Sequence, residues 1–182
     1  MITLNSIDDL TSSTIGKIIK KYKLEELPRL IKLDNYYKTK NEILKRQMID
    51  SSKPNNKIAN PYANYITDTL TGYFIGEPIT YNCDDKKILQ DLNMIFVYND
   101  EADENMELAK MASIFGVAYE MLYFSDEEKI VRFKSISPKE LIPIYDKTIE
   151  HNLLCAIRYY DDYDMIADKT YTIVDVITDK EV

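Results

Sequence analysis

The central part of the chain carries the pattern of a helix with a signal at each end. Its apolar positions recur at spacings of three and four, the period of one helix face. These positions are Tyr62, Ile66, Leu70, Tyr73 and Phe74. Asn60 is expected to cap the first turn, with Pro61 at the first helical position, where a missing N–H costs nothing. Gly76 is expected to end the helix at positive φ, with Pro78 beyond it, so the pattern predicts a helix over residues 61–75.

The N-terminal third shows the same periodicity, which indicates helices with one buried face. The apolar positions there are Ile15, Ile18, Ile19, Tyr22, Leu27, Leu30 and Ile31. Turn-forming residues cluster at positions 50–56 and predict a loop. We therefore expect an N-terminal helical segment over residues 1–50 and a second domain over residues 51–182.

Two more helices are expected after the central one, over about residues 84–97 and 100–115. Asp84 is the expected cap of the first, and Asn99 or Asp100 that of the second. Gly116 is expected to end the second helix.

Strand patterns follow Gly116. Residues 117–124 and 130–136 predict a hairpin, joined by an acidic turn. Residues 137–140 are expected to form one helical turn. Residues 141–145 are expected to form an edge strand, because Pro143 cannot donate to a sheet ladder.

Two last strands are expected at residues 153–160 and 171–177, with a polar connection between them. Helices in the first half and strands in the second indicate the α+β class with a small, mostly antiparallel sheet. A chain of 182 residues with 45% hydrophobic and 30% charged positions is long enough for a sizeable core. No segment resembles a membrane span or a secretory signal, so we expect a cytoplasmic chain.

The charge is distributed unevenly. Residues 1–60 hold 12 Lys and Arg against 7 Asp and Glu, whereas residues 61–182 hold 11 against 24, which gives +5 and −13. An acidic surface repels phosphate and disfavours a sequence-reading nucleic-acid binder. The basic residues Lys17, Lys20, Lys21 and Lys23 are the candidates for a phosphate contact, although the solvated face of a helix is the favoured interpretation.

The sequence offers little material for catalysis. His151 is the single histidine and lies in an expected turn, and no nucleophile elbow or phosphate-binding glycine loop can be assembled. Cys83 and Cys155 have no metal-ligand spacing and suit two reduced thiols. Acidic residues gather at Asp100, Glu101, Asp103, Glu104 and Glu107, where the helix dipole favours them. We expect no catalytic residue, no cofactor and no metal.

The run from Asn55 to Tyr81 resembles the early segment of tailed-bacteriophage portal proteins, in particular those of siphovirus-type phages of Gram-positive hosts. Four other blocks follow that family in order and approximate spacing. They are residues 36–44, 115–120, 136–146 and 156–160. Together they place the chain beside one family over about residues 30–160.

The first block departs from the family at one position. Family members usually have two tyrosines, any residue and then a glycine, whereas Thr39 follows Tyr36, Tyr37 and Lys38 here. Family members are usually more than twice as long, so the chain corresponds to their N-terminal, wing-like part. The stem, clip and crown are expected beyond Val182.

The resemblance implies a set of structural motif residues. They are Tyr36, Tyr37, Asn56, Asn60, Gly72, Gly76, Pro78, Gly116, Pro138, Tyr145 and Arg158. Gly72 and Gly76 also form a GxxxG spacing, for which a local packing role is favoured over a subunit contact.

The resemblance also implies a function: a ring at one vertex of the virion capsid through which DNA is packaged and ejected. Its expected partners are further copies of itself, the terminase large subunit, capsid and head-to-tail connector proteins, and double-stranded DNA without sequence specificity. Assembly is expected in the host cytoplasm, without a membrane. Two alternatives remain open, a protein-binding adaptor and an enzyme that uses the carboxylates of residues 100–107.

Overall fold

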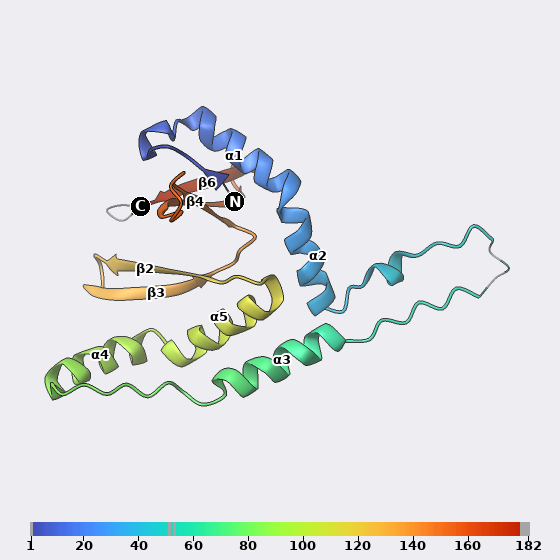
Figure 1. The fold of residues 1–182 in the computed structure, drawn as a ribbon. Helices are drawn as coiled ribbons and strands as arrows, with labels where there is room; N and C mark the ends of the chain where they lie inside the picture. The colour runs from blue at the N-terminus through green and yellow to red at the C-terminus, as the bar shows by residue number, and fades with distance from the viewer. Residues whose placement is uncertain (1, 51, 53, 179–182) are drawn as a thin grey trace. The chain divides into compact units, whose positions relative to one another are not determined.

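The computed structural model describes residues 2–50, 52 and 54–178, with helices in the first half and strands in the second (Figure 1). The helices are α1 (Ser12–Glu25), α2 (Leu27–Tyr37), α3 (Tyr62–Ile75), α4 (Lys86–Tyr98) and α5 (Glu101–Phe115), with 3-10 turns η1 (Ile7–Asp9) and η2 (Glu42–Lys45). The strands are β1 (Ile2–Thr3), β2 (Tyr119–Ser125), β3 (Ile130–Ile136), β4 (Leu141–Tyr145), β5 (Leu153–Asp164) and β6 (Lys169–Ile177). The predicted α+β class is confirmed.

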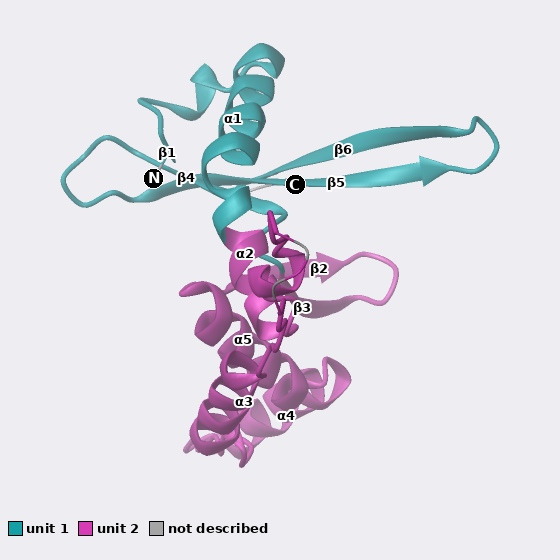
Figure 2. Cartoon of the chain, turned by 90° about the vertical axis from the view of Figure 1, so that its right-hand side faces the viewer, with its two compact units in different colours: residues 1–29, 137–182 teal, residues 30–136 magenta. Residues whose placement is uncertain are grey.

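The chain divides into two compact units, and the boundary falls inside α2. Residues 1–29 and 137–182 form the first unit and residues 30–136 the second, teal and magenta in Figure 2. The N-terminal helix α1 therefore shares a unit with the C-terminal strands. This grouping differs from a division of the chain at residue 50. Positions 50, 52 and 54–56 lie outside helices and strands, as the predicted loop requires, and residues 51 and 53 lie outside the described residues.

The first unit is a four-stranded sheet in the order β1-β4-β5-β6, packed against α1. The β1–β4 pair is parallel, and the other two pairs are antiparallel. Ile18 is the buried residue of α1, and Ile15, Ile19 and Tyr22 pack beside it. The predicted apolar face of this helix is confirmed. The buried residues of this core are Ile18, Ile142, Ile144, Cys155, Ile157 and Tyr159.

Two tyrosine hydroxyls hold the turn that leads into β4. Tyr22 donates to the carbonyl of Pro138 at 2.6 Å, and Tyr159 donates to the following carbonyl at 2.8 Å. Pro138 is among the most deeply buried side chains. The N–H of Glu140 bonds the carbonyl of Ser137 at 3.0 Å, so the expected helical turn is a single hydrogen-bonded turn and not a helix.

The prediction that Pro143 confines its strand to a sheet edge is wrong. Strand β4 lies between β1 and β5. Strand β1 pairs only with Ile144 and Tyr145, so the parallel ladder begins after the proline and does not need its missing N–H. A two-residue neighbour is therefore compatible with Pro143 in an inner strand.

The last two strands are longer than predicted. Strand β5 pairs with β4 only as far as Arg158, whereas its pairing with β6 runs on to Asp164. The segment beyond Arg158 is a two-stranded ribbon that extends past the rest of the sheet (Figure 2). The polar run expected to connect the strands therefore pairs in part, leaving residues 165–168 as the turn.

The second unit combines α3, α4 and α5 with a β2–β3 hairpin. Helix α3 packs along α5, and α4 and α5 both contact β3. The hairpin is antiparallel from Tyr119 opposite Ile136 to Ser125 opposite Ile130, and Lys129 turns at φ 56°. The predicted hairpin is confirmed.

The helix starts differ from the predicted ones by one or two residues. Helix α3 begins at Tyr62, and Pro61 occupies the cap position at φ −81° and ψ 38° without a side-chain bond. Asn60 is therefore not the cap, because a cap side chain must stand next to the first helical residue to reach the amides of that turn. Helix α4 is capped by Asp85 instead of Asp84. The Asp85 carboxylate accepts from the two amides that follow Lys86, at 2.8 and 3.3 Å.

The helix ends give one confirmed and one wrong prediction. Gly116 ends α5 at φ 78°, as expected. Gly76 ends α3 at φ −67° and ψ −17°, so the predicted left-handed cap is wrong. A β-carbon on Gly76 would lie 2.2 Å from the carbonyl oxygen of Gly72. The chain therefore uses glycine at position 76 for a close approach between backbone segments.

Helix α2 ends in a Schellman motif with Thr39 at its left-handed position. The N–H of Lys40 bonds the carbonyl of Asn35 at 2.7 Å, and the N–H of Thr39 bonds that of Tyr36 at 3.1 Å. Thr39 adopts φ 58°, which a β-branched side chain disfavours. This is the position where the portal proteins usually have glycine.

We expect Gly76→Ala to destabilise the protein by roughly 1–3 kcal/mol, because the added methyl group overlaps a fixed carbonyl. For a chain of this length, each kcal/mol lowers the melting temperature by about 2–4 °C. The matched control is Gly72→Ala, whose methyl group meets nothing within 4 Å. Thermal unfolding of both variants checks this, and equal melting temperatures would contradict the close approach.

We expect Thr39→Gly to stabilise the protein by about 1 kcal/mol. The strain of a left-handed L-residue, roughly 1–2 kcal/mol, exceeds the extra backbone entropy that glycine loses on folding. Lys40→Gly is the control, because its φ is not positive and glycine there should destabilise. Chemical denaturation measures both, and a loss of stability in Thr39→Gly would refute the strain.

Candidate functional site

The exposed surface of α3 is its apolar side. Thr67 and Thr71 are the buried residues of this helix, at 6% and 7% exposure, whereas Tyr73 is 93% and Phe74 is 79% exposed. The predicted stripe exists, but it faces away from the core of its unit. Its members, together called the α3 stripe, are Tyr62, Tyr65, Ile66, Leu70, Tyr73 and Phe74.

The polar side of α3 has partners within the second unit. The Thr67 hydroxyl lies 3.5 Å from that of Ser113 on α5. Tyr37 at the end of α2 donates to Asp68 at 2.9 Å. These contacts fix the rotation of α3 about its axis, so the apolar side is directed outward.

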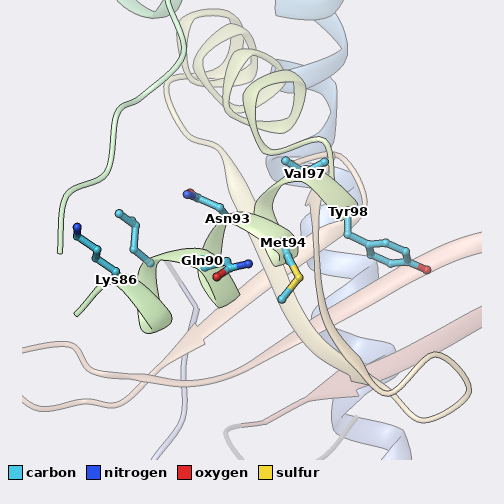
Figure 3. A pocket seen from close by; sticks show the side chains of 7 residues that line it. Lys86, Gln90, Asn93, Met94, Val97 and Tyr98 are labelled. Atoms are coloured by element: carbon cyan, nitrogen blue, oxygen red, sulfur yellow. The ribbon is translucent and has the colours of Figure 1, made fainter. Parts of the chain in front are cut away.

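Helix α4 also carries an exposed apolar groove, of about 530 Å3. Figure 3 shows its lining along one side of the helix. The groove, called the α4 groove, is lined by Lys86, Leu89, Gln90, Asn93, Met94, Val97 and Tyr98. Val97 is 80% exposed. The opposite side of α4 packs inward through Phe96, whose ring lies 4.6 Å from that of Tyr81 and 6.4 Å from that of Phe133.

A buried asparagine fixes the corner between α4 and α5. Asn99 donates to the carbonyls of Ile95 at 2.8 Å and Val131 at 3.0 Å, and it accepts from the N–H of Phe133 at 3.3 Å. It therefore joins the end of α4 to β3. Asp100 follows at φ 53° and starts α5 without a side-chain bond, so the cap position is as predicted but the capping bond is absent.

Glu104 makes the second connection to β3. Its carboxylate accepts from the N–H of Ser135 at 2.8 Å and pairs with the ammonium of Lys134. Burial acts to raise the pKa of Glu104, but these hydrogen bonds outweigh it and hold the pKa below its ordinary value. The same carboxylate raises the pKa of Lys134. Glu104 is thus held ionised as a structural anchor.

The other acids of the cluster at residues 100–107 also have structural partners. Glu101 accepts from Tyr81 at 2.6 Å and from Asn105, and Glu107 pairs with Lys110. Among the described residues, no group of three or more His, Cys, Asp and Glu side chains is arranged to hold a metal ion. His151 stands at φ 51° in the turn between β4 and β5, as the sequence predicted. The chemistry of this surface is therefore that of packing and charge pairing.

The motif residues of the second unit line its helix ends and one helix–helix contact. Tyr37 bonds α3, and Tyr36 lies beneath the ammonium of Lys32 at 5.9 Å. Gly116 provides a positive φ and Gly76 a close approach. Gly72 has open space where a side chain would stand. Asn56, Asn60 and Pro78 are exposed in the segments that flank α3.

The motif residues of the first unit lie around β4 and β5. Pro138 is buried under Tyr22. Tyr145 ends β4, where its carbonyl accepts from the N–H of Leu4 at 2.9 Å. Arg158 lies 4.4 Å from the ring of Tyr160 and 3.4 Å from the carboxylate of Asp175. All of these residues support the fold, and each unit has its own set.

The family model described as "Phage portal protein, SPP1 Gp6-like" matches residues 16–182. The chain belongs to this family. Among curated relatives, the portal protein of Bacillus phage SPP1 is 27% identical over 170 residues, which is 87% of this chain and 33% of the relative. The portal protein of Clostridium phage phiCD119 is also 27% identical over 170 residues, which is 83% of this chain and 38% of the relative.

The chain spans about a third of the length of these portal proteins. Phage portal proteins are structural components of the virion and not enzymes, and the family is one of connectors that oligomerise. Within the described residues, no helix has both the length and the apolar character needed to cross a bilayer. The surfaces that matter in such a protein are therefore those that contact other chains.

We expect Glu104→Gln to lower the free energy of unfolding at pH 7 by about 1–3 kcal/mol, because it removes a charged acceptor from buried donors. A carboxyl with a lowered folded-state pKa stabilises the fold above the ordinary carboxyl pKa and loses that contribution as the pH falls. The parent should therefore lose stability between about pH 5 and pH 3, and the variant should lose less.

Urea denaturation at pH 7, 5 and 3 measures the effect of Glu104→Gln. Glu107→Gln removes a more exposed acid of the same helix turn and is the control, with an expected change below about 1 kcal/mol. Equal pH profiles for the parent and Glu104→Gln would show that this carboxylate does not anchor β3.

Proposed function

We propose that this chain provides the wing-like part of a phage portal, the ring at one capsid vertex through which DNA is packaged and ejected. The observation that supports it most strongly is the family match over residues 16–182. The order of the four motif blocks and the central run agrees with it. The ring is the functional unit, so the relevant contacts are those between copies.

The proposed relation to DNA is passage without sequence reading. The 61–182 segment carries a net charge of −13, which disfavours tight binding of a phosphate backbone. The lysines of α1 are exposed, but Lys21 lies 3.9 Å from Glu25, and the Lys23 ammonium stands 5.0 Å from the ring of Tyr159. These neighbours fit the solvated face of a helix, which leaves DNA free to slide.

The proposed partners are the terminase large subunit, which supplies the packaging energy, the capsid protein and the head-to-tail connector proteins. Assembly would take place in the host cytoplasm, and the product would reside in the virion. The proposal includes no cofactor, metal or membrane. An enzyme that uses the acids at residues 100–107 is disfavoured, because Glu101, Glu104 and Glu107 are engaged in hydrogen bonds and ion pairs.

The proposed function is tested in the phage or prophage that carries the gene. Loss of the gene should leave heads without packaged DNA, measured as nuclease-protected phage DNA per particle. A plasmid copy should restore that DNA at least tenfold. Normal amounts of protected DNA without the gene would refute the portal assignment.

We expect the 182-residue chain alone to fold and to remain monomeric or weakly associated at micromolar concentration. Stable interfaces bury about 1,200–2,000 Å2 in total, and a chain about a third as long as its relatives has correspondingly less surface to offer. Light scattering coupled to size exclusion measures its mass. A stable closed ring formed by these 182 residues would refute the prediction.

A further inference from the structure

The α3 stripe is large enough to be one side of a specific protein contact. Its four aromatic members are Tyr62 and Tyr65, each 68% exposed, Tyr73 at 93% and Phe74 at 79%. A buried aromatic side chain contributes roughly 150–250 Å2, so these four expose on the order of 450–750 Å2. Monomeric proteins rarely expose apolar patches beyond a few hundred Å2, and a standard interface buries about 800 Å2 on each partner.

The chemistry of the stripe favours a protein surface as its partner. Tyrosine presents an apolar ring with a polar tip, and it is enriched at the centre of protein interfaces. Asp68 and Glu77 stand exposed beside the stripe. Aromatic rings with an acidic margin fit an apolar groove that has a basic margin.

The α4 groove has those properties. Leu89, Met94 and Val97 provide its apolar floor, and Lys86 stands exposed at one end with Lys87 beside it. Methionine adapts its shape to an incoming side chain. The groove therefore complements the α3 stripe in polarity and in charge.

The symmetry of a ring explains why one chain would carry both surfaces. A closed ring uses head-to-tail contacts, in which each copy presents two different and complementary patches. The second unit presents an aromatic stripe on α3 and a groove on α4, and both are exposed in the described structure. The family is one of connectors that oligomerise. A second copy of the chain is thus the occupant that these observations favour.

We propose that the α3 stripe of one copy packs into the α4 groove of the next copy, as a head-to-tail contact of the assembled ring. This inference rests on the proposed portal function and names the surfaces through which it assembles. Tyr73 and Phe74 would enter the groove beside Met94 and Val97. The exposed acids near α3 would then lie close to the lysines at the start of α4.

Disulfide trapping in the 182-residue chain tests the contact. Tyr73→Cys and Val97→Cys are combined in a Cys83→Ser background, because Cys83 is exposed whereas Cys155 is buried. Each copy then carries one cysteine on each face. At about 100 μM under mild oxidation, head-to-tail contacts should produce a ladder of dimers, trimers and longer species on a non-reducing gel.

The matched control replaces Val97→Cys with Ile149→Cys, a position that is 99% exposed in the turn between β4 and β5 of the other unit. The ladder of the first pair should form at least tenfold faster than that of the control. Equal rates would overturn the proposal. Dimers formed as fast by Tyr73→Cys alone would also overturn it, because α3 would then pair with itself.

The phage-encoded protein provides the second measurement. Tyr73→Glu changes an exposed side chain and should leave the melting temperature unchanged, yet reduce ring formation at least tenfold. Normal rings in Tyr73→Glu would overturn the contact while leaving the portal function intact. Protection of Tyr73→Cys from maleimide in the monomer would show that the same polypeptide covers the stripe, which would also overturn it. Failure of the portal function itself is seen separately, as DNA packaging that does not need the gene.

Discussion

Helix α3 packs on α5 through Thr67 and Thr71, and the surface of the second unit depends on this contact. Two small β-branched polar residues let the helices approach without burying a large side chain. The hydroxyl pairing with Ser113 and the Tyr37–Asp68 bond then fix the rotation of α3. The aromatic side of the helix is directed outward as a direct consequence. A protein that gained only from its own folding would have buried that side.

The connection of α4 and α5 to β3 supplies the rigidity that such a surface needs. Asn99 and Glu104 bond the backbone of β3 from both sides of the α4–α5 corner. A buried polar group with all its partners present specifies one arrangement, because any shift leaves a donor or acceptor unpaired. The α4 groove is therefore presented by a helix whose end is fixed by hydrogen bonds as well as by the packing of Phe96.

The sequence predicted the existence of the elements better than their ends. Periodicity located all the helices of the first half and the β2–β3 hairpin, since it reflects which side chains share a face. The caps at Asn60 and Gly76 were wrong because a residue type with a strong preference does not fix its own φ and ψ. Gly76 is needed for space against the Gly72 carbonyl, which only the folded backbone reveals. Pro143 in an inner strand likewise depends on how short its neighbour β1 is.

The candidate site was visible in the sequence only in part. The α3 stripe was read correctly as a pattern, but periodicity cannot tell whether an apolar face meets the core or another chain. The anchoring role of Glu104 was hidden, because an acid in a first helical turn has a sufficient local explanation in the helix dipole. Thr39 was the exception, since its departure from a family glycine pointed to the strained position that the structure contains.

Exposed apolar faces of moderate size suit an assembly that must form only as a ring. In a head-to-tail ring each copy makes two contacts, so removal of one copy breaks two interfaces, whereas a free pair is held by one. A contact too weak to keep two copies together can therefore hold a closed ring, since closing the last interface is an intramolecular step at high effective concentration. Stronger faces would also stabilise open chains and incomplete rings. The aromatic stripe of α3 and the groove of α4 are of the size that such cooperative closure requires.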